Sequence, residues 1–193
     1  MVRTRHPLID TDIHPILKPD HVAEFLPEPW RRRYASGNLG PGRLGYWNPH
    51  DIHRSDAVAD DGTRIEGDPK HLGKYFFDAY GIEYGVLNLE HLDIALSPEP
   101  DYAAAVMAAR NDVLVHHWLP VDSRFRASLT VTTVDPELAA REIHRLGDHP
   151  GIVQVLLPSG ARMPYGQRFY HPIYAAAVEH DLPVAIHPGS EGL

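Results

Sequence analysis

Short apolar runs recur along the chain, and each is followed by polar or turn-forming residues. These runs occupy residues 8–14, 85–90, 125–131, 152–157 and 182–187. The run at 152–157 is nearly continuous in apolar residues, which is typical of a strand buried on both faces of a parallel sheet. We therefore expect an α/β domain with five strands that alternate with helices.

Helical patterns fill the intervals between these runs. Leu72, Tyr75, Phe76 and Ala79 lie at positions i, i+3, i+4 and i+7, which predicts one buried helix face. Shorter helices are expected at residues 19–26 and 30–34, a long one from 101 to about 119, and a last one around 173–178.

The clearest helix start in the sequence lies after the third apolar run. Asp135 is a good N-cap, Pro136 suits the first helical position, and Glu137 places a negative charge in the first turn. We therefore expect a helix from this point to about Leu146.

The connection between the first two strands, residues 35–68, is rich in Gly, Pro, Asp and Asn. Loops of this length are usually either functional or disordered. The segment also contains Trp47 and Arg54, so two interpretations stand side by side: a folded lid over a site, or a mobile surface insertion. On the first interpretation, the segment covers the carboxyl ends of the strands.

Candidate chemistry lies at the end of the first apolar run. Asp12 and His14 are two residues apart, so in a strand both point to one side, while Ile13 points to the other. A carboxylate and an imidazole that converge on one point form half of a metal site. The alternative is that Asp12 caps a turn and His14 lies on a loop.

The last apolar run repeats this design. His187 stands at its carboxyl end and is followed by Pro188 and Gly189. In parallel α/β barrels, functional residues gather at the carboxyl ends of the strands. By the same logic, the second strand would present Glu90 or His91.

Composition narrows the classes of function. The 193 residues carry a formal net charge of −8, which argues against a nucleic-acid surface, and there is no apolar run of membrane-spanning length. There is no cysteine, so a bound metal would need His and carboxylate ligands. The N-terminus lacks the apolar core of a signal peptide, and we expect a cytoplasmic protein.

Two motifs resemble a known family. Ile9-Asp-Thr-Asp-Ile-His14 and Leu182-Pro-Val-Ala-Ile-His-Pro-Gly189 are similar to the amidohydrolase-related family that includes aminocarboxymuconate-semialdehyde decarboxylase. The resemblance implies a (β/α)₈ TIM barrel with a divalent metal held by Asp12, His14 and His187. Zinc is the first expectation and manganese the second. The family usually has His at the first of these positions, where this chain has Asp12.

The resemblance also sets an expectation about extent. Such barrels need about 250 residues and eight strands, whereas this chain ends soon after its fifth apolar run. We expect residues 1–193 to form an incomplete barrel domain with an insertion at 35–68, the N-terminal portion of a longer enzyme. Its general base would lie beyond residue 193, and its open sheet edges favour a homo-oligomer.

We consider three functions in order of preference, and the resemblance implies the first two of them. The first is a metal-dependent hydrolase that acts on a small carboxylate or aromatic substrate through a metal-activated water. The second is a non-oxidative decarboxylase on the same fold, and the third is a non-catalytic partial barrel that serves as a binding or structural subunit. Trp47, Arg54 and His91 are the candidate substrate-binding residues.

Overall fold

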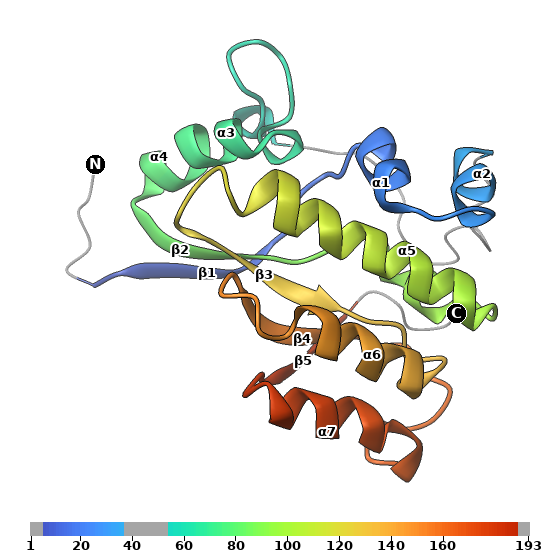
Figure 1. Ribbon diagram of the computed structural model, residues 1–193. Coiled ribbons are helices and arrows are strands. Elements are labelled where there is room, and N and C mark those ends of the chain that lie inside the picture. The colour runs from blue at the N-terminus through green and yellow to red at the C-terminus, as the bar shows by residue number, and fades with distance from the viewer. Residues whose placement is uncertain (1–5, 37–53, 189–193) are drawn as a thin grey trace.

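Five parallel strands in sequence order form the sheet of this protein (Figure 1). The computed structural model describes residues 6–36 and 54–188. Helices connect successive strands, as expected for the first five βα units of a TIM barrel. The strands are β1 (Leu8–Ile13), β2 (Ile82–Leu87), β3 (Phe125–Thr130), β4 (Ile152–Pro158) and β5 (Val184–His187).

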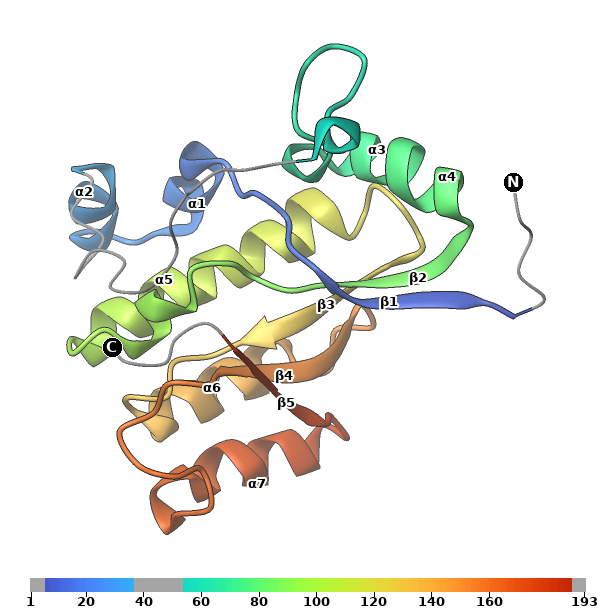
Figure 2. The same ribbon diagram turned by 180° about the vertical axis from the view of Figure 1, so that it is seen from behind.

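The three longest helices cover one face of the sheet, and the view from behind exposes the other face (Figures 1 and 2). The α-helices are α1 (Pro19–Phe25), α2 (Trp30–Ala35), α3 (Pro69–His71), α4 (Asp78–Tyr80), α5 (Pro100–Val113), α6 (Pro136–Leu146) and α7 (His171–Glu179). Two π-helical stretches, η3 (Leu72–Phe77) and η5 (Leu114–Trp118), continue α3 and α5. The 3₁₀ turns among the described residues are η1 (Ser55–Ala57), η2 (Ile65–Gly67), η4 (Leu92–Leu96) and η6 (Arg168–Tyr170).

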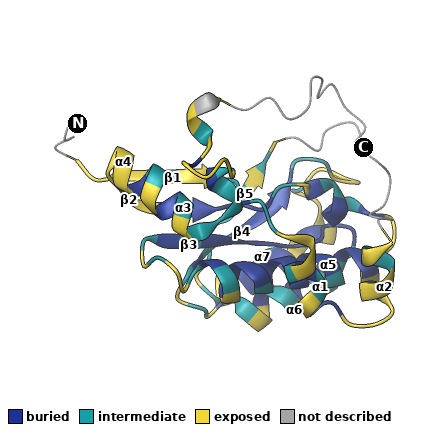
Figure 3. Cartoon of the chain, turned by 90° about the horizontal axis from the view of Figure 1, so that it is seen from above, coloured by how far each residue is buried: buried dark blue, intermediate teal, exposed yellow. Residues whose placement is uncertain are grey.

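The core lies between the sheet and these helices (Figure 3). Apolar side chains of β3 and β4 are buried there, in agreement with the nearly continuous apolar pattern expected for residues 152–157. The predicted N-cap of α6 is confirmed, because the Asp135 carboxylate accepts hydrogen bonds from the backbone N–H groups of Glu137 and Leu138.

One strand boundary differs from the prediction. The second strand was expected at residues 85–90, but β2 runs from Ile82 to Leu87. Gly81 has a φ of 70° and ends α4, so the chain turns directly into the strand. The strand therefore delivers Asn88 at its carboxyl end, and Glu90 and His91 lie in the following loop.

The described part of the insertion, residues 54–68, contains the turns η1 and η2 and an isolated bridge between Val58 and Arg64. The backbone N–H of Ile16 donates a hydrogen bond to the carbonyl of Glu66, which fixes this segment beside the end of β1. The lid over the site stays a prediction, and residues 37–53 lie outside the described residues.

Within residues 6–36 and 54–188, no helix combines the length and apolar character needed to span a membrane. In the described sheet, β1 and β5 each have a partner strand on one side only. The expected homo-oligomer and the cytoplasmic location stay predictions.

Close packing around Gly85 in β2 generates a testable prediction. A Cβ atom at this position would lie 2.3 Å from Phe77 Cζ and 2.5 Å from Ile13 Cδ1. We expect Gly85→Ala to lower the free energy of unfolding by about 1–3 kcal/mol through overpacking, measured by urea denaturation.

Gly166→Ala is the matched control, because a Cβ there meets nothing within 4 Å. It should change stability by less than about 0.5 kcal/mol. Equal effects of the two substitutions would contradict this account of the packing.

Candidate metal centre

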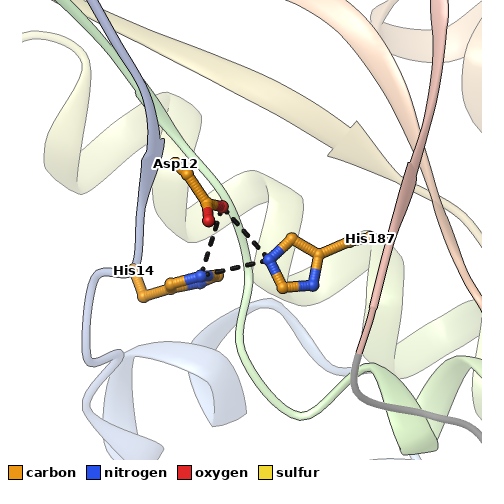
Figure 4. A group of neighbouring side chains, drawn as sticks. All are labelled: Asp12, His14 and His187. Atoms are coloured by element: carbon orange, nitrogen blue, oxygen red, sulfur yellow. Dashed lines mark hydrogen bonds and ion pairs between the residues drawn. The ribbon is translucent and has the colours of Figure 1, made fainter.

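Asp12, His14 and His187 converge at the carboxyl end of the sheet (Figure 4). His187 Nε2 lies 3.1 Å from Asp12 Oδ1 and 3.2 Å from His14 Nε2, and His14 Nε2 lies 3.3 Å from Asp12 Oδ1. The two imidazole rings meet edge to face, with an interplanar angle of 89°. The convergence expected from the strand-end pattern is therefore present.

Backbone geometry explains why His187 lies beside Asp12 and His14, which precede it by 175 and 173 positions. Asp12 and His14 flank Ile13, whose side chain is buried in the core, so both polar side chains point to the opposite side of the sheet. His187 is the last residue of β5, and its Cα pairs with that of Pro158 at the end of β4. Parallel strands end at the same edge, which brings the three side chains together.

Hydrogen bonds to the outer nitrogens fix the tautomers of the two rings. His14 Nδ1 lies 3.2 Å from the Asn88 carbonyl oxygen, and His187 Nδ1 lies 2.6 Å from the Pro188 carbonyl oxygen. A carbonyl oxygen only accepts, so both Nδ1 atoms carry the proton. In the neutral rings, both Nε2 lone pairs then face each other and the Asp12 oxygen.

This arrangement needs a positive charge at its centre, because three lone pairs within 3.3 Å of one another repel. A proton on one ring or a metal ion would satisfy the need. Two imidazole nitrogens and a carboxylate oxygen make a donor set suited to zinc or manganese, so the residues present fit the metal that the sequence predicts.

The electrostatics of Asp12 favour its charged form. Burial acts to raise the pKa of this carboxyl. The hydrogen bond from Asn88 and the proximity of His14 and His187 outweigh that effect and lower the pKa below its ordinary value. Asp12 is therefore a carboxylate, the form that binds a cation, throughout the neutral pH range.

A cavity of about 530 Å³ opens beside the cluster, and Asp12 and His14 form part of its wall. This volume lies within the range of small-molecule sites. Its other lining residues are apolar and aromatic side chains, carboxylates and the arginine Arg54. The lining residues include Ile65, Leu72, Tyr75, Phe76, Tyr80 and Glu90.

The structure separates the predicted substrate-binding residues. Arg54 lines the same cavity, and its guanidinium donates to both carboxylate oxygens of Asp56, at 2.8 and 2.5 Å. His91 is not among the cavity-lining residues; it lies in the loop after β2 with a φ of 56°. Trp47 lies outside the described residues.

Sequence reasoning missed Asn88, which contacts two of the three candidate ligands. Its side-chain amide donates to Asp12 Oδ1 at 2.9 Å, and its backbone carbonyl oxygen accepts from His14 Nδ1. The sequence reasoning placed the second strand at residues 85–90, so Asn88 was taken as a residue inside the strand and not at its carboxyl end. The signal was the helix-ending Gly81, which places the strand three residues earlier and Asn88 at its carboxyl end.

Comparison with known proteins identifies the family. Residues 9–192 match the amidohydrolase family, and the chain belongs to it. Among solved structures, 5-carboxyvanillate decarboxylase from Novosphingobium aromaticivorans, complexed with manganese and 4-hydroxy-3-methoxy-5-nitrobenzoic acid, superposes with a TM-score of 0.68 at 24% identity. That alignment covers 96% of this chain and 51% of the other.

A second solved structure, 2,6-dihydroxybenzoate decarboxylase from Rhizobium, gives a TM-score of 0.61 at 20% identity over 95% of this chain and 50% of the other. These likenesses show that the sheet and helices form the first part of the barrel. A curated relative, γ-resorcylate decarboxylase from Rhizobium radiobacter, is 27% identical over 118 residues, which are 58% of this chain and 36% of that protein. The chain spans about half the length of the solved structures it matches.

Metal binding by the three-residue cluster is tested directly by thermal melts with and without Mn²⁺ or Zn²⁺. Bound metal at 100 times its Kd adds about 2.7 kcal/mol of stability, so the melting temperature should rise. His187→Ala should abolish this rise, and Asp12→Asn should reduce it in part, because an amide oxygen still coordinates weakly.

His180→Ala is the matched control, because it removes an imidazole that contacts Asp148 and His144 rather than the cluster. It should keep the metal-dependent rise. If His187→Ala lowers the melting temperature while metal content is unchanged, His187 is a packing residue and not a ligand.

Proposed function

We propose that this chain forms the first part of a metal-dependent decarboxylase that acts on small aromatic carboxylic acids. The observation that carries the proposal is the cluster of Asp12, His14 and His187, whose lone pairs converge beside a cavity with aromatic walls. Membership of the amidohydrolase family supports the metal-dependent part of this proposal.

The relatives favour decarboxylation over the hydrolysis that the sequence suggested first. The curated and solved proteins described above are all named as decarboxylases of hydroxylated benzoates. In the proposed reaction, the bond between the ring carbon and the carboxylate breaks, carbon dioxide leaves, and the electron pair stays on the ring carbon. A proton then replaces the carboxylate, so neither an oxidant nor a reductant is needed.

Each residue of the cluster has a defined part in this proposal. Asp12, His14 and His187 would hold the metal, and their second contacts keep each donor atom directed at it. When bound, the metal would supply Lewis-acid chemistry toward an oxygen of the substrate. The manganese in the related structure supports manganese rather than zinc as the resident ion.

The charge of the cavity bears on substrate binding. Its lining includes the carboxylates of Asp10, Asp12 and Glu90, which repel an anionic substrate. Arg54 is the cationic side chain among the described lining residues. Binding of an aromatic acid would therefore depend on the charge of the metal together with Arg54, while Tyr75 and Phe76 offer faces for the ring.

The reaction is tested with the complete enzyme, of which this chain is proposed to form the first part, purified and loaded with Mn²⁺. Given 2,6-dihydroxybenzoate or 5-carboxyvanillate, it should release one carbon dioxide for each substrate molecule consumed, followed by gas or bicarbonate analysis and by chromatography. His187→Ala should lower the rate by at least about 100-fold, because it removes a ligand of the catalytic metal. His180→Ala should leave the rate unchanged.

Cleavage of amide or ester substrates without release of carbon dioxide would overturn the proposal in favour of a hydrolase. Release of carbon dioxide at equal rates by the wild type and His187→Ala would show that the reaction does not use this cluster.

Arg54 generates a separate prediction about substrate binding. Arg54→Met should raise KM roughly tenfold and change kcat little, because it removes one charged hydrogen bond to the substrate carboxylate. Arg32→Met is the matched control, since Arg32 is an exposed arginine of α2 that does not line the cavity. Equal KM values in the two variants would show that Arg54 does not bind the substrate.

A further inference from the structure

Asn88 directly follows β2 and connects the end of that strand to Asp12 and His14, the two candidate ligands from the end of β1. Its side chain is 2% exposed, and its Nδ2 donates to Asp12 Oδ1 at 2.9 Å and to the Thr11 carbonyl at 3.1 Å. Its backbone N–H donates to the Ile13 carbonyl at 2.7 Å, and its own carbonyl accepts from His14 Nδ1. One residue therefore contacts the whole end of β1.

The orientation of the Asn88 amide follows from these partners. The Asp12 carboxylate and the Thr11 carbonyl only accept hydrogen bonds, so the nitrogen must face them. The Asn88 oxygen then faces the opposite way, where the Ser128 hydroxyl donates to it at 2.5 Å. Ser128 belongs to β3 and is fully buried, so water does not compete for this bond.

The hydrogen-bond chain extends one strand further. Gln154 of β4 donates from Nε2 to Ser128 Oγ at 2.7 Å. Because the Ser128 proton is used toward Asn88, its oxygen is free to accept, and the Gln154 nitrogen must face it. The chain thus runs in one direction, from Gln154 through Ser128 and Asn88 to Asp12, and crosses four adjacent strands.

We propose that Asn88 is a positioning residue of the metal centre, and that Ser128 and Gln154 hold its amide in the required orientation. The inference rests on the proposed function. The Asp12 oxygen that receives the Asn88 hydrogen bond is the one that faces His14 and His187. Asn88 therefore limits rotation of the carboxylate before metal binds, and its carbonyl keeps the His14 lone pair directed inward.

Residues behind a metal ligand typically change metal affinity by about 10- to 100-fold when they are mutated. We expect Asn88→Ala to raise the Kd for Mn²⁺, measured by calorimetry on the full chain, within this range. The His14 tautomer should persist in this variant, since the backbone carbonyl remains, and ¹⁵N NMR of the ring would show it. Ser128→Ala keeps Asn88 and should raise the Kd several-fold.

Asn111→Ala is the matched control for a purely structural effect. Asn111 is also buried, at 1% exposed, and its amide donates to the Thr130 carbonyl and to Glu142, neither of which is a candidate ligand. This variant should lose stability in the presence of EDTA as Asn88→Ala does, and yet bind Mn²⁺ with the Kd of the wild type.

Two failures are distinguishable. If the wild type binds no Mn²⁺, the proposed function fails. If the wild type binds Mn²⁺ and both Asn88→Ala and Ser128→Ala bind it equally well, the proposed function stands and the positioning role is overturned. If Asn88→Ala does not fold, Ser128→Ala alone tests the positioning role. This variant interrupts the hydrogen-bond chain at its middle and leaves the contacts between Asn88 and β1 intact.

Discussion

The convergence of three donor atoms at the end of the sheet is the constraint on which the rest of the site depends. Two imidazole nitrogens and a carboxylate oxygen lie within 3.3 Å of one another, and the outer nitrogen of each ring faces a carbonyl oxygen. Such a cluster is unfavourable without a cation or a proton among its donors. The surrounding structure must therefore place these donor atoms within reach of one cation.

The parallel strands hold the three donor atoms in these positions. All five strands end at one edge, and the buried side chain of Ile13 anchors the strand that carries Asp12 and His14. The polar groups inside the sheet are not a defect of the core, because Asn88 and Ser128 find hydrogen-bond partners in each other and in their neighbours. A buried polar chain that is fully satisfied gives a defined geometry that apolar packing alone would not specify.

The cavity beside the cluster combines two opposing properties. Its aromatic wall suits a flat ring, whereas its carboxylates disfavour an anion. A bound divalent ion reverses the second property, because its charge is the largest in such a site. On the proposed function, substrate affinity and metal occupancy would be coupled through electrostatics, and Arg54, which is paired with Asp56, would make the smaller contribution to substrate binding.

The sequence by itself determined the α/β class, the order of the strands, the N-cap of α6 and the three candidate ligands. These features depend on local patterns: side-chain alternation, capping chemistry, and polar residues at strand ends. Only the tertiary structure decided that Asn88 faces Asp12, that Glu90 and not His91 lines the cavity, and that Arg54 is paired with Asp56. The positions of Asn88 and His91 depend on where β2 ends and how neighbouring strands register, and a shift of a few residues changes which side chain reaches the site. The position of Arg54 depends instead on how residues 54–68 pack beside the end of β1.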